Sequence, residues 1–221
     1  MVAFSDYLER KLLDAILRNT SYAAPATIYL ALYTSSPTDT GSGIECAGGS
    51  YARKALASGF PAASGTTGAV ANSANITFTT ATAAWGTVTS VMLLDGDNQK
   101  NFTNANITTG TDQITITSHG FTTADQVSIS RPNATGTFPT GITEGAVYFA
   151  RSVDANTITL HPTAADASGN TNIVDITAAG SGTFYINKGN PLLYGDLGSS
   201  QAVANGNTFQ IDAGNLTVTL S

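Results

Sequence analysis

The run Thr87-Val-Thr-Ser-Val-Met-Leu-Leu-Asp95 decides the fold, because it predicts a strand that enters a turn at residues 96–98. Far along the chain, Pro191-Leu-Leu-Tyr-Gly-Asp-Leu197 predicts the strand that resumes this pattern. A different series of short strand candidates lies between the two runs. We therefore expect a discontinuous framework, residues 1–98 plus 188–221, with residues 99–187 set into a hairpin tip as a separate small domain.

The composition restricts the classes of function that are open to the chain. Charged residues make up 11% of it, against roughly 25% in ordinary soluble domains. The net charge of -6 and the scattered basic residues argue against nucleic-acid binding, which depends on basic contacts to phosphate. The single cysteine, Cys46, rules out an internal disulfide, and we interpret it as an incidental small apolar residue.

The sequence also lacks membrane and secretion signals. No apolar stretch approaches the ~18 residues of a membrane span. The N-terminus does not show a basic start followed by an apolar run. We expect no membrane contact, and assembly in a cytosol.

Residues Ser5–Asn19 predict the one convincing helix. Five apolar residues recur at helical spacing, Ser5 can cap the first turn, and Arg18 favours the last. Such a helix must lie on a sheet or on a partner, and we expect it to lie on its own sheet. The apolar residues are Leu8, Leu12, Leu13, Ile16 and Leu17.

The rest of the framework predicts short strands separated by turns. Thr27–Thr34 is apolar on both faces, so we expect a central strand that the helix covers on one side. Residues 35–50 form a long loop rich in turn residues, which we expect to contact a neighbouring subunit. The fold class is therefore mainly β, with a sandwich or barrel-like framework. The remaining strand candidates are Tyr51–Ala57, Asn75–Thr79, Asn190–Leu197, Thr208–Ile211 and Asn215–Leu220, with turns at Ser64–Gly68 and Ser199–Gly206.

The insert predicts a small β-barrel-like domain. Its apolar residues suffice for a small barrel but not for a large core, and Asp154–Asn156 predicts a hairpin turn. Both ends of the insert, near Asn98 and Asn187, must lie close together if they join paired strands. The strand candidates are Gln113–Thr117, Gln126–Ser130, Ala146–Ser152, Thr157–Leu160, Ile173–Thr177 and Thr183–Ile186, with one helical turn at Ala164–Ala167.

Residues that could carry chemistry are few. His119 and His161 are the only histidines, and with one distant cysteine they do not supply the three or four ligands of a zinc site. We interpret His119 as a turn residue bound to backbone groups. Asp95-Gly-Asp-Asn98 lacks the full calcium-loop pattern, so turn chemistry explains it better. We therefore predict no catalytic, cofactor-binding or metal-binding residue, and no enzyme.

Two stretches resemble known phage proteins. The framework resembles a family of bacteriophage virion proteins, often labelled tail fibre or structural proteins, in which a short turn usually stands where this chain carries its insert. The insert is similar to a small β module of phage fibre and decoration proteins. The framework motifs include Ala24-Pro-Ala-Thr-Ile-Tyr-Leu-Ala-Leu-Tyr-Thr34, Gly49-Ser-Tyr-Ala-Arg53 and Ile76-Thr-Phe-Thr-Thr-Ala-Thr-Ala-Ala-Trp-Gly-Thr-Val88; those of the insert include Ile114-Thr-Ile-Thr-Ser-His-Gly-Phe121 and Val153-Asp-Ala-Asn-Thr-Ile158.

The resemblance implies a non-enzymatic virion protein. We expect a capsid decoration, or cement, protein on the outer head surface, which binds the major capsid protein and copies of itself as a dimer or trimer. The alternative is a tail-associated fibre, collar or baseplate adaptor, whose insert contacts a host-surface glycan. A third hypothesis, a virion-bound depolymerase, lacks the acid and base cluster that it needs.

Overall fold

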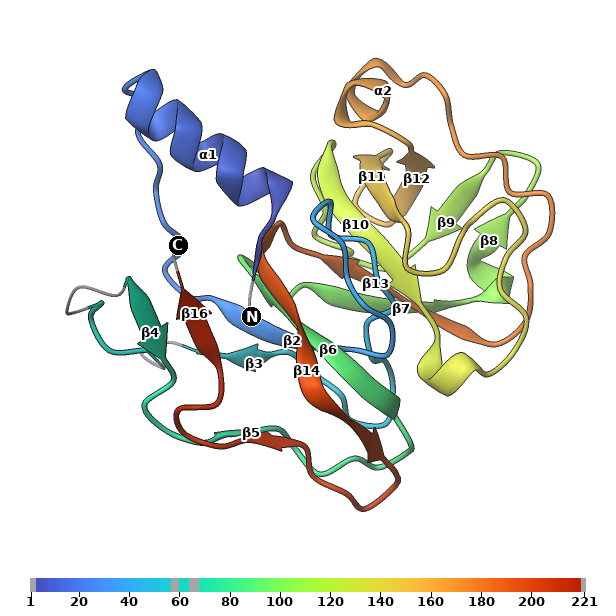
Figure 1. Ribbon diagram of the computed structural model, residues 1–221. Helices are drawn as coiled ribbons and strands as arrows, with labels where there is room; N and C mark the ends of the chain where they lie inside the picture. The colour runs from blue at the N-terminus through green and yellow to red at the C-terminus, as the bar shows by residue number, and fades with distance from the viewer. Residues whose placement is uncertain (1–2, 57–59, 64–67, 220–221) are drawn as a thin grey trace.

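The computed structural model describes residues 3–56, 60–63 and 68–219 and shows a mainly β protein with one N-terminal helix (Figure 1). The framework contains an antiparallel five-stranded sheet, and its strand order is β1-β14-β6-β2-β3. Its strands are β1 (Ala3–Phe4), β14 (Pro191–Val203), β6 (Gly86–Leu94), β2 (Tyr29–Tyr33) and β3 (Lys54–Ala55).

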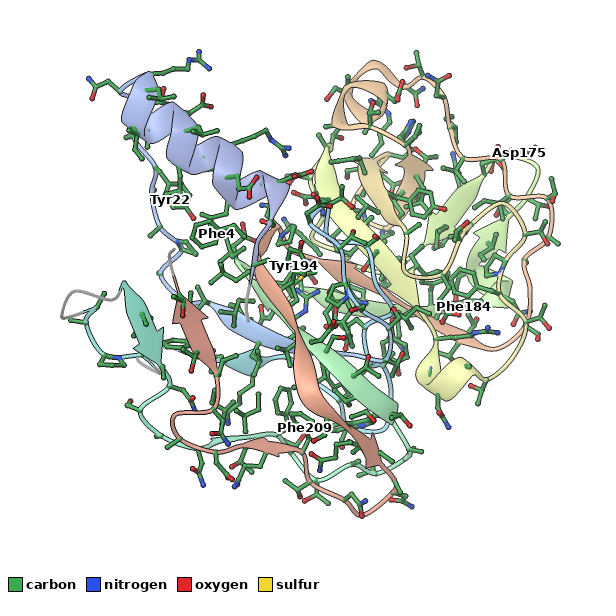
Figure 2. The ribbon with its side chains drawn as sticks, in the orientation of Figure 1. Phe4, Tyr22, Asp175, Phe184, Tyr194 and Phe209 are labelled. Carbon is green, nitrogen blue, oxygen red and sulfur yellow. The ribbon has the colours of Figure 1, made fainter. Side chains whose placement is uncertain are left out.

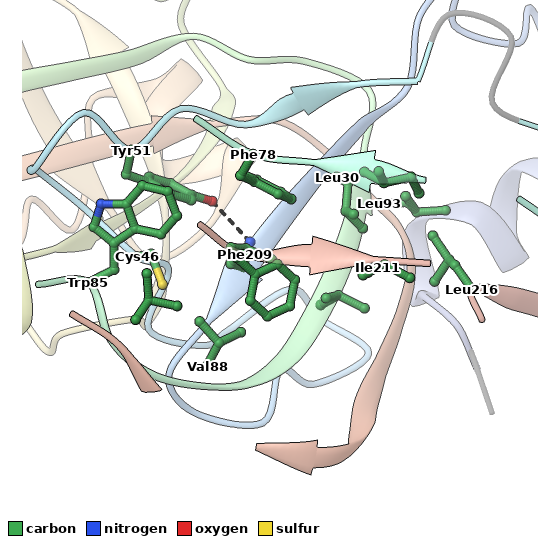
Figure 3. Packing of buried hydrophobic residues seen from close by; sticks show 14 of the residues in the cluster. Leu30, Cys46, Tyr51, Phe78, Trp85, Val88, Leu93, Phe209, Ile211 and Leu216 are labelled. Atoms are coloured by element: carbon green, nitrogen blue, oxygen red, sulfur yellow. Dashed lines mark hydrogen bonds between the residues drawn. The ribbon is translucent and has the colours of Figure 1, made fainter. Parts of the chain in front are cut away.

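A second layer closes the framework core. It consists of two strand pairs, each of which joins a segment before the insert to a segment after it. Figure 3 shows Phe209 and Leu216 of this layer packed with Leu30 and Leu93 of the five-stranded sheet. Trp85 lies in the same core and is 1% exposed. The pairs are β4 (Ala69–Ala71) with β16 (Thr217–Thr219), and β5 (Ile76–Thr77) with β15 (Gln210–Ile211).

Several framework strands differ in length from the expectation. The turn expected at residues 199–206 is confined to its end. β14 continues to Val203 and resumes pairing with β6 at Gln201 after an irregularity, and the Asn207 N–H then donates to the Ala204 carbonyl at 3.0 Å. The strand expected at residues 51–57 is reduced to β3. The turn expected at residues 64–68 and the end of the last strand at Leu220 fall largely outside the described residues.

The insert forms a seven-stranded, nearly closed barrel-like sheet of strand order β7-β13-β10-β11-β12-β9-β8. The hairpin turn at residues 154–156 is confirmed, and so is the helical turn, which forms α2 (Ala164–Gly169). The short helices η1 (Asn104–Asn106) and η2 (Pro132–Ala134) complete it. The strands are β7 (Gln99–Thr103), β8 (Ile107–Thr108), β9 (Gln113–Thr115), β10 (Asp125–Ser130), β11 (Val147–Ser152), β12 (Thr157–His161) and β13 (Thr183–Lys188).

Two expectations for the insert were wrong. Residues 173–177 form no strand. The apolar residues of the insert were expected to form its core, yet Val153 and Ile173 are 47% and 37% exposed. The strands β7 and β8 were missed, although Phe102 and Ile107 bring buried apolar side chains from them into the core. Most other expected core residues of the insert are buried around Phe184.

Helix α1 (Asp6–Leu17) does not lie on its sheet as expected. Ser5 caps it, since its Oγ accepts from the Leu8 N–H at 3.2 Å and donates to the Pro191 carbonyl. The first turn packs against the framework core through Tyr7 and Leu8. The second half extends away from the sheet (Figure 1) and leaves an exposed apolar surface. Leu13, Ile16 and Leu17 are 55%, 76% and 74% exposed.

The second face of β2 and β6 is therefore covered by something other than the helix. Tyr33 and Leu94 on this face are buried. They line a small cavity together with Val127 and Asn187 of the insert and with Gly41 of the 35–50 loop. The loop and the insert thus supply the cover that we had expected from α1.

Candidate functional site

The insert leaves and re-enters the framework at one narrow junction. The Lys188 N–H donates to the Asn98 carbonyl at 2.9 Å, beside the paired strands β7 and β13. The carboxylate of Asp95 accepts from the backbone and side-chain N–H groups of Asn190, both at 2.7 Å. The expected closeness of Asn98 and Asn187 is confirmed, and Asp95 acts as a turn residue that ties the two framework strands together.

Arg53 binds both ends of the insert at this junction. Its Nη1 donates to the carbonyl oxygens of Gly96 and Lys188, each at 2.6 Å. Its Nε and Nη2 donate to the two carboxylate oxygens of Glu45, each at 2.8 Å. One guanidinium therefore holds the outgoing and the returning chain against the 35–50 loop, in the planar forked geometry that arginine favours.

The Arg53–Glu45 pair is almost fully dry. The two side chains are 2% and 0% exposed. Glu45 also accepts from the Tyr51 hydroxyl at 3.1 Å, and the Tyr51 oxygen accepts from the Leu32 N–H at 3.0 Å. Burial alone would lower the pKa of Arg53, but the charge and hydrogen bonds of Glu45 raise it above its ordinary value. Arg53 is therefore charged, and it depends on Glu45 to remain so in a dry site.

The side chains around Glu45 are kept neutral. Burial first, and then the charge of Glu45, raise the pKa values of Tyr33, Tyr51 and the Cys46 thiol. A thiol that stays protonated and buried is a poor nucleophile. Cys46 is thus a small core residue, as expected, and this buried cluster holds the chain in place without reactive chemistry.

Residues 41–48 of the 35–50 loop pack against the rest of the molecule, whereas Thr38, Asp39 and Thr40 are exposed, and the contact with a neighbouring subunit stays a prediction. The Gly43 N–H donates to the Gly145 carbonyl at 2.7 Å, and Gln126 Nε2 donates to the Thr40 carbonyl at 2.9 Å. Gly145 has a φ of +74°, and a Cβ there would lie 2.7 Å from the Gly43 carbonyl carbon. Glycine is therefore needed where the loop and the insert meet.

Both histidines are buried and bound within the insert. His119 Nδ1 accepts from the Phe121 N–H at 2.9 Å, so Nε2 carries the proton that it donates to the Asp154 carbonyl at 2.8 Å. The interpretation of His119 as a turn residue bound to backbone groups is confirmed. His161 is held between the Thr159 hydroxyl and the Thr171 carbonyl.

Neither a metal cluster nor a bilayer-spanning helix occurs in the described part of the chain. Over residues 3–56, 60–63 and 68–219, no group of three His, Cys, Asp or Glu side chains gathers as it would around a metal ion. Across these same residues, no helix has the length and apolarity to cross a bilayer.

Arg53 and Glu45 were not singled out from the sequence. The two residues stand eight positions apart in turn-rich segments, and a spacing of eight indicates no contact. The sequence did contain a signal for this pair, because Arg53 and Glu45 are isolated charges in a chain with only 11% charged residues. Charged residues that are buried are almost always paired.

The family described as "Podophage GP4 fiber I protein gp80" has a model that matches residues 3–130. The match crosses the junction and extends to the end of β10, whereas the resemblance had led us to expect only a short turn after the framework strand. No curated protein matches the chain.

Proposed function

The chain belongs to the family of the podophage GP4 fiber I protein gp80, and from that premise we propose that it is a fibre-associated protein of the phage tail. The family supports the coarser assignment, a structural protein of the virion. In our proposal the protein is not an enzyme. The framework attaches to the particle and the insert is presented outward.

The contacts of Arg53 at the junction between framework and insert are the observation that supports this proposal. A buried ion pair contributes little net stability compared with apolar residues of similar volume. The Arg53–Glu45 pair instead fixes a geometry, because Arg53 donates two hydrogen bonds to Glu45 and two to the carbonyls of Gly96 and Lys188, which flank the insert. A protein that presents a domain in one direction needs such a fixed base.

The family description favours a fibre over the capsid decoration protein that we had expected. The low content of charged residues fits permanent assembly in either place, so it does not separate the two. Copy number does. A decoration protein covers the head and approaches the major capsid protein in abundance, whereas a fibre protein is present in a small fraction of that number.

The experiment is quantitative gel densitometry of purified virions, combined with immunogold labelling of the full-length protein. We expect a band far weaker than that of the major capsid protein and gold particles confined to the tail. A band of comparable strength, with gold over the head, would replace the fibre proposal with capsid decoration. Absence from the particle would refute both.

The proposed function also implies binding partners for the framework and for the insert. We propose contacts of the framework with the particle and with further copies of the chain, and contact of the insert with a host-surface glycan. Analytical ultracentrifugation of the full chain tests self-association as a dimer or trimer. Binding of the full chain to polysaccharide extracted from the host envelope tests the glycan, and a matched neutral polymer such as dextran serves as the control.

A further inference from the structure

A groove opens on the framework between β14 and the C-terminal strands. It has a volume of about 580 Å³. Its apolar floor comes from Val91, Phe209 and Leu216, and exposed polar side chains form its walls. β14 has a second edge, on the side away from β6. The groove itself is lined by Val91 of β6, by residues of β14 between Gly195 and Gln201, and by residues between Phe209 and Thr219. No feature of the junction uses it.

The walls of this groove are open strand edges. β14 pairs on this side only with β1, at Leu193 and Tyr194. From Gly195 to Val203 its one partner among the described strands is β6. β16, which supplies Thr217 and Thr219 to the groove, pairs only with β4. Open edges present backbone N–H and C=O groups that a further strand can bind.

The groove is also acidic. Asp196 and Asp212 stand among its lining residues, which include no Lys or Arg. Asp196 accepts from the hydroxyls of Ser36 and Ser90. These two hydrogen bonds hold the pKa of Asp196 below its ordinary value, so the carboxylate is charged at neutral pH. An occupant with a basic side chain would therefore be favoured.

The chain cannot easily supply that occupant from a second copy. All nine of its basic residues are already fixed in the described structure. Three lie on or at the end of α1, four lie in paired strands, and Arg53 and Arg131 lie in ion pairs. A second copy would have to lose structure to place a basic extended segment in the groove.

We propose that the groove between β14 and β16 binds an extended segment of a different virion protein, which adds as a β-strand and places a Lys or Arg near Asp196 and Asp212. This proposal rests on the proposed function, because it takes the partner from the same particle. Alternate apolar side chains of the segment would face the floor at Val91 and Leu216. The groove is then the attachment site of the framework.

Gly198 offers a sharp test. Nothing lies within 4 Å of where its Cβ would stand, and its φ is not in the left-handed region, so Gly198→Trp fills the groove without strain. Gly110, exposed in the insert, has the same properties and provides the matched control Gly110→Trp. We expect both full-length variants to fold with unchanged Tm. We expect Gly198→Trp to lower incorporation into virions at least tenfold, and Gly110→Trp to leave incorporation unchanged.

A photo-crosslinking amino acid at position 198, irradiated in intact virions, identifies the occupant. The proposal is supported if the cross-linked peptide comes from another virion protein and carries Lys or Arg within an alternating apolar segment. It is overturned if the peptide comes from a second copy of the chain, if an incorporated variant gives no cross-link, or if Gly198→Trp is incorporated normally. Absence of the wild-type protein from virions is a separate result, which refutes the proposed function and this partner together.

Discussion

The framework and the insert are both antiparallel β structures, but they close their cores in different ways. The insert draws its core from residues 102–186 alone, within one nearly closed sheet. The framework needs Leu30 near one end of the sequence and Leu216 near the other. It also leaves an open edge along β14 and an exposed helix face.

The insert therefore forms its core within itself, whereas the framework has an open strand edge and an exposed apolar surface that a partner could cover. The insert pairs β10 with β11, β11 with β12 and β8 with β9 as sequence neighbours, and its other pairings also stay within residues 99–188. The framework can complete its core only after the whole insert has been made, because β14, β15 and β16 follow it. The less closed region is the one that we assign to attachment.

Removal of the insert should have the largest effect. We expect replacement of residues 99–187 by a two-residue Asn-Gly turn to leave a folded framework, since Asn98 and Lys188 are already hydrogen-bonded neighbours. Its stability should fall more than in any single variant, because the face at Tyr33 and Leu94 loses its cover. Fluorescence of Trp85, the one tryptophan, reports the fold. An unfolded product would show that the framework depends on the insert.

Truncation of one core phenylalanine in each region tests whether the two cores are independent. Phe209→Ala and Phe184→Ala should each cost about 3–5 kcal/mol, since both side chains are buried. In urea titrations, Phe209→Ala should shift the Trp85 fluorescence transition by that amount, and Phe184→Ala should shift it much less. Equal shifts in the two variants would mean that the cores unfold as one unit.

Arg53→Met breaks the link between the regions. We expect a loss of about 3–5 kcal/mol in the free energy of unfolding, because Glu45 keeps a buried charge without its partner. Amide exchange at Lys188 should also speed up. Arg131→Met removes the half-buried pair with Glu144 and should cost about 1 kcal/mol or less. Similar losses in the two variants would contradict the importance of burial at the junction.

The helix caps allow a smaller comparison between the regions. Ser5→Ala removes the α1 cap and the buried hydrogen bond to Pro191, so we expect a loss of about 1–2 kcal/mol in urea denaturation. Thr163→Ala removes the exposed cap of the short α2, where the Thr163 hydroxyl accepts from the Asp166 N–H and donates to the Asp166 carboxylate, and should cost about 0.5–1 kcal/mol. The reverse order would argue against the buried role of Ser5.

The smallest effect on stability should come from the exposed face of α1. Ile16→Ser combined with Leu17→Ser should change the free energy of unfolding by about 0.5 kcal/mol or less, because both side chains already face solvent. Leu8→Ser, on the face that packs against the framework core, serves as the sensitive control and should cost clearly more. A large loss in the double variant would show that the face is covered in solution.

Local pattern was enough to predict the framework hairpin, the capped helix and most strands of the insert. Prediction from local pattern failed where contacts with distant segments determine the local structure. Ser199 and Ser200 favour a turn, yet they lie in an irregularity of β14, which resumes pairing with β6 at Gln201. Residues 173–177 alternate like a strand but make only single backbone hydrogen bonds, such as that from the Val174 N–H to the Leu160 carbonyl, whereas the polar β7 is a strand because β13 pairs with it. The exposure of Ile16 and the meeting of Arg53 with Glu45 likewise depend on where distant segments lie.

The position of Arg53 also has a mechanical consequence. The insert is attached at the tip of the β6–β14 hairpin, and the carbonyls of Gly96 and Lys188 meet at one guanidinium. Tension on the insert therefore reaches β6 and β14 together and runs along their axes. Separation of the two strands from the tip requires that the hydrogen bonds from Arg53 to the Gly96 and Lys188 carbonyls break, in a site that is almost fully buried.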